Sequence, residues 1–108
     1  MRLLWLAAFP VIAAAAPALA DDPTFALSIR DHKFEPARIE VPANQRFRLL
    51  VKNLDDTAEE FESVELKREK VIPGGRQAII QLGPLAPGTY KFFGEYHEAT
   101  AQGVIVAK

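Results

Sequence analysis

The chain contains no cysteine. It therefore has no disulfide, and its stability must come from packing alone. The same absence excludes a thiolate nucleophile, a zinc–thiolate centre and a copper ion ligated by cysteine. The single methionine, Met1, lies in a segment that we expect to be removed, which leaves no sulfur ligand. Carboxylate oxygen and imidazole nitrogen are the side-chain metal donors that remain.

The chain also lacks an excess of charge of either sign. Its 13 basic and 14 acidic residues nearly cancel, and no basic run occurs. A balanced charge provides no electrostatic basis for binding nucleic acid, so we expect no nucleic-acid partner. A chain of 108 residues is sufficient for one domain with one small core and too short for a two-domain enzyme.

Residues 1–20 have the pattern of a signal peptide. Arg2 supplies the positive n-region, residues 3–12 form a short apolar run, and Ala18-Leu19-Ala20 matches a small-x-small cleavage site. We therefore expect residues 21–108 to form the mature domain, exported to the periplasm and not inserted in the membrane. The rival interpretation is an uncleaved anchor. At about 18 residues the apolar segment reaches the lower limit for spanning a bilayer, and Pro10 and Pro17 interrupt it.

The rest of the chain favours short strands separated by Pro- and Gly-containing turns. Apolar residues alternate with polar ones in most of these strands, and Asp31-His32-Lys33 is predicted to be a turn. About seven strands are expected, at 24–30, 39–41, 47–51, 59–66, 78–82, 90–93 and 103–107. This pattern predicts an all-β fold, a Greek-key β-sandwich.

The segment from Glu59 to Leu66 is ambiguous. Its glutamates are poor strand formers, and propensity alone would allow a short helix over 58–70. The spacing of the neighbouring strands favours a strand, followed by an irregular Lys67–Lys70 segment. That charged segment is interpreted as an edge that discourages strand addition, with a docking patch as the alternative.

The polar loop over residues 94–102 is the strongest candidate for a functional site. It places Glu95, His97 and Glu98, which bind cations or transfer protons, between two strands expected to belong to the core. A loop held by rigid strands at both ends is a typical location for a site.

Several segments together resemble the cupredoxin family, and most closely its EfeO-type domain from bacterial periplasmic iron uptake. The resemblance covers 25–108 and is carried by Phe34-Glu35-Pro36, Ile39-Glu40-Val41, Asn53-Leu54-Asp55, Phe61, Pro87-Gly88-Thr89-Tyr90-Lys91-Phe92, His97 and Gly103-Val104-Ile105-Val106. It is carried further by Glu60-Phe61-Glu62-Ser63, Arg68-Glu69-Lys70-Val71 and Gly94-Glu95-Tyr96-His97-Glu98. The resemblance implies a cupredoxin-like fold. It also implies a partner, either a membrane iron permease or another periplasmic iron-uptake component.

The resemblance also indicates where the ligands of a type 1 copper site would fall. They align with Glu59, Gly94, His97 and a position near Thr100, and of these only His97 keeps the family's ligand type. Because blue-copper electron transfer depends on the copper–thiolate bond, we expect no such site here.

A hard-donor metal site is the remaining hypothesis. The candidate ligands are His97, Glu95, Glu59, Glu60, Glu62 and Glu98, and the ion is iron or copper. If Phe61 points into the core, Glu59 lies on its side of the strand and Glu60 and Glu62 lie on the other. Several carboxylates would favour Fe(III) over Fe(II) by charge.

Each candidate also has a structural interpretation. His97 is then a loop residue hydrogen-bonded to backbone, and Glu60 and Glu62 form a solvated face. His32 is interpreted as a solvated turn residue, and Glu98 as a solvated charge.

These residues are compatible with three functions. The first is an exported metal-binding accessory of iron uptake, which binds iron or copper without turnover. The second is a copper-dependent ferroxidase that works with an iron permease. The third is a metal-free interaction domain. A ferroxidase needs a redox metal and an electron exit, so binding is preferred over catalysis, and no catalytic residue is assigned.

Overall fold

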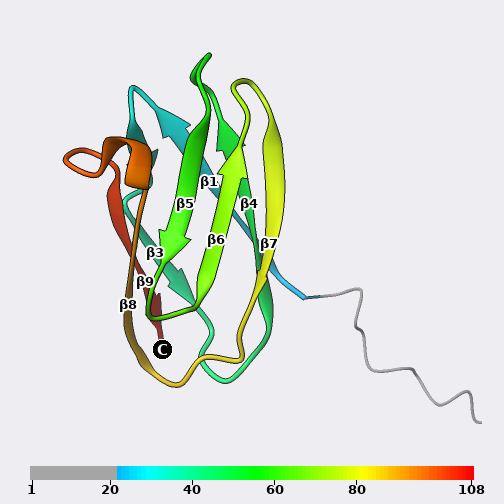
Figure 1. Ribbon diagram of the computed structural model, residues 1–108. Coiled ribbons are helices and arrows are strands. Elements are labelled where there is room, and N and C mark those ends of the chain that lie inside the picture. Colours follow the sequence, from blue (N-terminus) through cyan, green and yellow to red (C-terminus); the bar gives the residue numbers. More distant parts are fainter. Residues whose placement is uncertain (1–21) are drawn as a thin grey trace, which may run out of the picture.

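The computed structural model describes residues 22–108, which form a sandwich of two β-sheets (Figure 1). The expected signal peptide, residues 1–20, lies outside the described residues. The strands are β1 (Thr24–Arg30), β2 (Lys33–Glu35), β3 (Arg38–Val41), β4 (Phe47–Asn53), β5 (Glu59–Ser63), β6 (Arg68–Ile72), β7 (Gln77–Leu82), β8 (Gly88–Phe93) and β9 (Gln102–Ala107). A 3-10 helix, η2 (Glu95–His97), lies between β8 and β9. Among residues 22–108, no helix is long and apolar enough to cross a bilayer.

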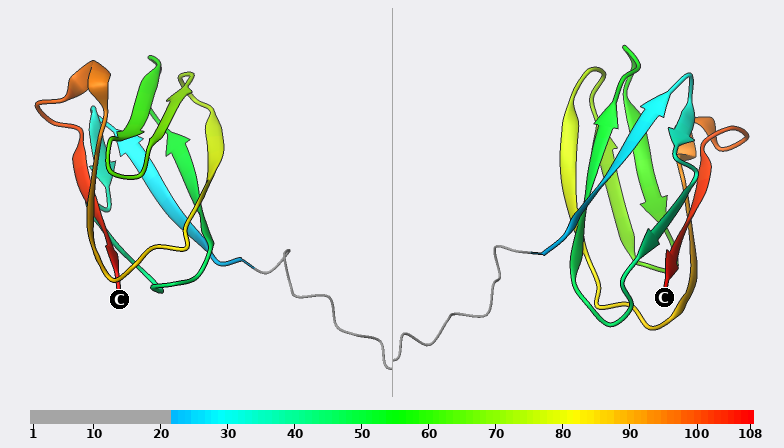
Figure 2. Two further views of the ribbon diagram at one scale, coloured as in Figure 1. Left: turned by 60° about the horizontal axis from the view of Figure 1, so that its bottom comes forward. Right: turned by 180° about the vertical axis from the view of Figure 1, so that it is seen from behind.

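Both sheets are mixed. The first has the order β2-β1-β4-β7 and the second the order β3-β9-β8-β5-β6. The β1–β4 and β3–β9 pairs are parallel, and the remaining pairs are antiparallel. Figure 2 shows the two sheets facing each other, with η2 at the end of the sandwich opposite the C-terminus.

The sheets enclose one apolar core, as the alternation in the sequence predicts. Strand β4 illustrates the pattern, because Phe47, Leu49 and Val51 are at most 1% exposed while the residues between them are partly exposed. Phe34, Phe61 and Phe92 pack together beneath the η2 end, with ring centroids 4.9–6.3 Å apart. These rings provide a rigid base for the loops at that end.

The all-β sandwich expected from the sequence is confirmed, but the expected number of strands was too low. The described residues contain nine strands rather than about seven. β2 begins at Lys33, within the expected turn, and pairs with β1. The segment Lys67–Lys70, expected to be irregular, contributes Arg68–Lys70 to β6, which pairs with β5 along its whole length. Both strands are short or highly exposed, so they lack the apolar alternation that identified the other strands.

The strand interpretation of the Glu59 segment is confirmed over the helical one. Glu59–Ser63 form β5, and Val64–Lys67 form the turn to β6. Pairing with β6 and β8 therefore overrides the poor strand propensity of the glutamates.

Gly103 tests how tightly the core is packed. It pairs with Phe92, and a Cβ atom at residue 103 would overlap the buried ring of Phe92. We predict that Gly103→Ala lowers the free energy of unfolding by about 1–3 kcal/mol, the usual cost of overpacking. Gly88→Ala on the same hairpin is the control, because its Cβ would meet only ordinary contacts at 3.8 Å and beyond. Urea unfolding of both variants measures the difference, and equal stabilities would contradict the prediction.

Candidate metal site

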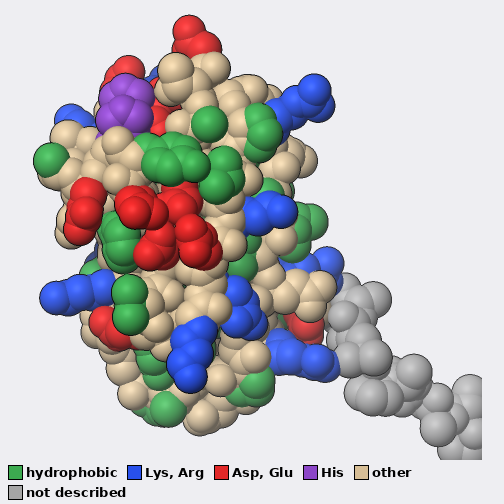
Figure 3. Space-filling view, in the orientation of Figure 1, with side chains coloured by type: hydrophobic (Ala, Val, Ile, Leu, Met, Phe, Trp, Pro, Cys, Tyr) green, Lys and Arg blue, Asp and Glu red, His purple; other side chains and the backbone are tan. Residues whose placement is uncertain are grey.

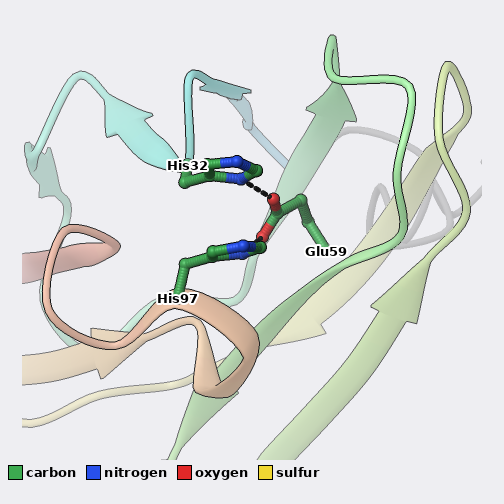
Figure 4. Close-up of side chains that lie close together, drawn as sticks. All are labelled: His32, Glu59 and His97. Atoms are coloured by element: carbon green, nitrogen blue, oxygen red, sulfur yellow. Dashed lines mark hydrogen bonds and ion pairs between the residues drawn. The ribbon is translucent and has the colours of Figure 1, made fainter.

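Three potential ligands converge at the η2 end of the sandwich, each from a different element. His32 lies in the turn between β1 and β2, Glu59 is the first residue of β5, and His97 is the last residue of η2 (Figure 4). Each offers one ligand atom, and these three atoms lie within 4.8 Å of one another.

Glu59 is the centre of this group. Its neighbours on the same side of β5, Phe61 and Ser63, are buried, so the pleat directs Glu59 inward as well, and it is 1% exposed. Its two oxygens each contact one imidazole. His32 Nδ1 lies 2.5 Å from Oε1, and His97 Nδ1 lies 3.1 Å from Oε2. A buried carboxylate needs such partners, because an unpaired buried charge is costly.

The two imidazole rings stack on each other. Their centroids are 3.5 Å apart and the rings are inclined by 16°. The side chains of His32 and His97 are 42% and 36% exposed, so the group is accessible from solvent. The hydrogen bond to Glu59 raises the pKa of His32, with further contributions from the negative charges of Glu59, Asp55 and Asp31.

The loop that carries His97 is held by its own backbone. The amide of His97 donates to the carbonyl of Gly94, and the amide of Ala101 donates to the carbonyl of His97. Gly94 is the position at which the resemblance places the ligand cysteine of a type 1 copper site. A Cβ atom there would lie 2.9 Å from the carbonyl oxygen of Glu60 and 3.0 Å from the Cβ of Ala101. The backbone at this position thus leaves little room for any side chain.

A second group of carboxylates lies on the other side of β5. Glu60, Glu62, Glu69 and Glu95 offer oxygens within 4.8 Å of one another, and Figure 3 shows the acidic patch below the histidines. Glu69 pairs with Glu62 across the β5–β6 hairpin. The η2 segment covers Glu60, whose Oε1 accepts the backbone N–H of Glu95 at 3.1 Å.

The electrostatics of this acidic group are unfavourable without a counter-charge. Glu60 is 2% exposed, and burial raises its pKa to about 7, with Glu69 and Glu62 adding to the shift. The pKa of Glu62 is raised as well, by burial and by the charges of Glu69 and Glu95. Glu62 Oε1 is also buried, and it has no hydrogen-bond donor when Glu60 is ionised. Either a proton or a cation would relieve this repulsion.

The six candidate ligands therefore do not form one cluster in the structure. Glu59 and His97 lie together, whereas Glu60, Glu62 and Glu95 form the acidic group. Glu98 is exposed and belongs to neither group.

Two members of these groups were not predicted from the sequence. His32 is a turn residue, as expected, but its ring contacts Glu59 instead of only solvent, and no local signal places it there. Glu69 could have been found, because a predicted hairpin between 59–63 and 68–72 would place it beside Glu62.

The two mixed sheets form a β-sandwich of the cupredoxin-like type. The chain belongs to this family, because the model of the cupredoxin-like domain matches residues 2–107. The chain is also 49% identical over 80 residues to an uncharacterized protein of Rickettsia prowazekii (strain Madrid E). The match covers 74% of this chain and 64% of that protein, so it leaves more than a third of the relative unmatched.

Solved structures with the same fold include copper proteins. Auracyanin A of Chloroflexus aurantiacus, a "blue" copper protein, has a TM-score of 0.68 at 14% identity, covering 79% of this chain and 98% of that one. The metal-binding domain of the Cu(I)-exporting P-type ATPase CopA of Streptococcus pneumoniae D39 has a TM-score of 0.70 at 13% identity, with coverages of 79% and 84%. At these identities the likeness establishes the fold alone.

The raised pKa of Glu60 predicts how stability depends on pH. Between pH 4.5 and about 7 the folded protein keeps a proton on Glu60 that the unfolded chain releases. The free energy of unfolding therefore falls as pH rises through this window. His32 acts in the same direction above pH 6.5, because its pKa is raised too.

We predict that Glu60→Gln flattens the dependence of the free energy of unfolding on pH between pH 4.5 and about 7. Glu65→Gln, which removes an exposed carboxylate outside the group, should leave the slope unchanged. Urea unfolding at a series of pH values measures both, and equal slopes in the two variants would contradict the assignment.

Proposed function

We propose that this protein is a periplasmic metal-binding accessory of bacterial iron uptake, of the EfeO type, and that His32, Glu59 and His97 hold its transition-metal ion. The observation that carries the proposal is the convergence of two imidazoles on one buried carboxylate. Each oxygen of Glu59 lies beside the Nδ1 atom of one ring, so a cation that displaces any protons held there would find three donors close together.

The donor chemistry favours copper(II) at this group. Two imidazoles and one carboxylate suit Cu(II), Zn(II) and iron, and Cu(II) binds such ligands most tightly among the divalent ions of the first row. Copper(I) is disfavoured, because it prefers soft sulfur ligands, which residues 22–108 do not provide. When bound, the ion would supply a redox-active or Lewis-acidic centre close to solvent.

Iron is proposed for the acidic group rather than for the histidines. Four carboxylates provide hard oxygen donors and a high negative charge, which suit Fe(III). The specific support is Glu62 Oε1, which is buried and has no hydrogen-bond donor once Glu60 is ionised. The nearly buried Glu60, with its raised pKa, adds a carboxyl group that a trivalent cation would deprotonate.

The preferred role is binding and delivery to a membrane iron permease, without turnover. A ferroxidase would consume Fe(II) faster than autoxidation only when loaded with copper. A metal-free interaction domain would show no metal-dependent rise in melting temperature, because any ligand of the native state must stabilise it. Export to the periplasm, which the proposal requires, rests on the signal-peptide pattern of residues 1–20.

Copper titration tests the histidine group. We predict one Cu(II) bound with a dissociation constant below about 100 µM, so that a tenfold excess over this value stabilises the protein by about 1.4 kcal/mol. His97→Ala should remove most of this rise in melting temperature, because it removes one of three ligands. Glu98→Ala, in the same loop, is the matched control and should keep it.

Calorimetry and thermal unfolding provide the readouts. Absence of copper binding in the wild-type protein would refute the site. A loss of more than about 2 kcal/mol in metal-free His97→Ala would instead indicate that His97 has a structural role.

Iron titration in crossed variants tests the acidic group. We predict that Fe(III), supplied as a weak chelate, raises the melting temperature of the wild type and of His97→Ala. The double variant Glu62→Gln/Glu69→Gln should lose this rise and keep the response to copper, because its histidine group is intact. Loss of both responses in either variant would show that the two groups are not separate sites.

A further inference from the structure

The turn that carries His32 has an unusual backbone. Asp31 and His32 both have positive φ, 53° and 59°, between the paired residues Arg30 and Lys33. Two-residue turns with φ > 0 at both positions are normally made with Asn, Asp and Gly. Asp and His are among the non-glycine residues that adopt this left-handed region most readily, but the conformation still costs free energy, which contacts from the surrounding structure must offset.

Asp55, from the loop between β4 and β5, binds this turn. Its Oδ1 accepts the backbone N–H of Asp31 at 2.8 Å, and its Oδ2 accepts that of His32 at 3.0 Å. Successive left-handed residues direct their N–H groups to one side, and a carboxylate fits this concavity. Oδ2 also lies 3.5 Å from the ring nitrogen Nδ1 of His32.

Asp55 is itself anchored to the core. Its backbone N–H donates to Asn53 Oδ1 at 3.0 Å, and its carbonyl accepts the N–H of Gly75 at 2.9 Å. Asn53 is 1% exposed, and its Nδ2 donates to the carbonyls of Thr57 and Ile72. A chain of hydrogen bonds thus runs from a buried amide to the turn of His32.

The other side of the same turn is held by Thr100. Its Oγ1 donates to the carbonyl of His32 at 2.6 Å and lies 3.3 Å from the carbonyl of His97. The hydroxyl therefore connects the backbones of the two histidines, one from each end of the chain.

We propose that Asp55 is a positioning residue of the metal site, which fixes the backbone of His32 so that its ring stacks on His97 and faces Glu59. The proposal rests on the proposed function of the histidine group. Asp55 acts through His32, and its carboxylate is occupied by two backbone N–H groups. Thr100 fixes the carbonyl side of the same turn through its hydrogen bond to His32.

Two matched variants test this assignment. Asp55→Asn keeps the shape of the side chain but places an amide NH₂ against a backbone N–H, so one of the two hydrogen bonds is lost. Asp56→Asn makes the same charge change on the adjacent, exposed aspartate. We expect Asp55→Asn to weaken Cu(II) binding 10- to 100-fold, the usual effect of losing a partner that orients a ligand. Asp56→Asn should leave the affinity within about twofold.

A second readout needs no metal. In the metal-free wild-type and Asp56→Asn proteins, NMR should detect a nuclear Overhauser contact between the rings of His32 and His97, which should be lost or weakened in Asp55→Asn. If Asp55→Asn does not fold, Thr100→Val provides a second test. It removes the hydrogen bond from Thr100 to the carbonyl of His32, and it should weaken both Cu(II) binding and the contact between the two rings.

The His32→Ala background distinguishes a positioning role from direct ligation. There Asp55→Asn should have no further effect on the residual copper affinity, because no ring is left to orient. A further loss in that background would make Asp55 a ligand and overturn the proposal, as would an unchanged ring contact and affinity in Asp55→Asn alone. Failure of the wild type to bind copper would refute the proposed function instead, and the metal-free ring contact would still test whether Asp55 orients His32.

Discussion

The contact of the Glu59 carboxylate with two histidine rings is the interaction on which the site depends. The carboxylate is 1% exposed, and burial of an acid is tolerable only where partners compensate for the lost water. His32 and His97 provide these partners from segments far apart in the sequence, and they stack on each other as they do so. The same contact thus joins the β1–β2 turn to the η2 loop and gathers three potential metal donors.

The pleat of β5 separates two kinds of chemistry that are adjacent in the sequence. Glu59 faces the histidines, while the next residue, Glu60, faces Glu62, Glu69 and Glu95. One side offers mixed nitrogen and oxygen donors, and the other offers only oxygen. Because hard and borderline metal ions differ in their preferred donors, the two sides of β5 would suit different ions.

Much of this arrangement could be predicted from local pattern. Alternation placed Glu59 on the core side of β5 and Glu60 and Glu62 on the other, and the resemblance identified the cupredoxin-like fold. β2 and β6 were missed as strands because their residues are mostly exposed, so only pairing with a neighbour defines them. His32 was interpreted as solvated, because nothing near it in the chain indicates that a buried carboxylate lies beside the turn.

The sequence by itself determined the available chemistry. Residues 22–108 contain no sulfur, so imidazole and carboxylate are their main metal-binding side chains, and the period of their apolar residues favours short strands. Which of these donors meet depends on the three-dimensional fold. It grouped His32 with Glu59 and His97, added Glu69 to the acidic group and left Glu98 in solvent. The physical reason is that such meetings depend on strand order and on turn geometry, and these are properties of the whole sandwich rather than of any one segment.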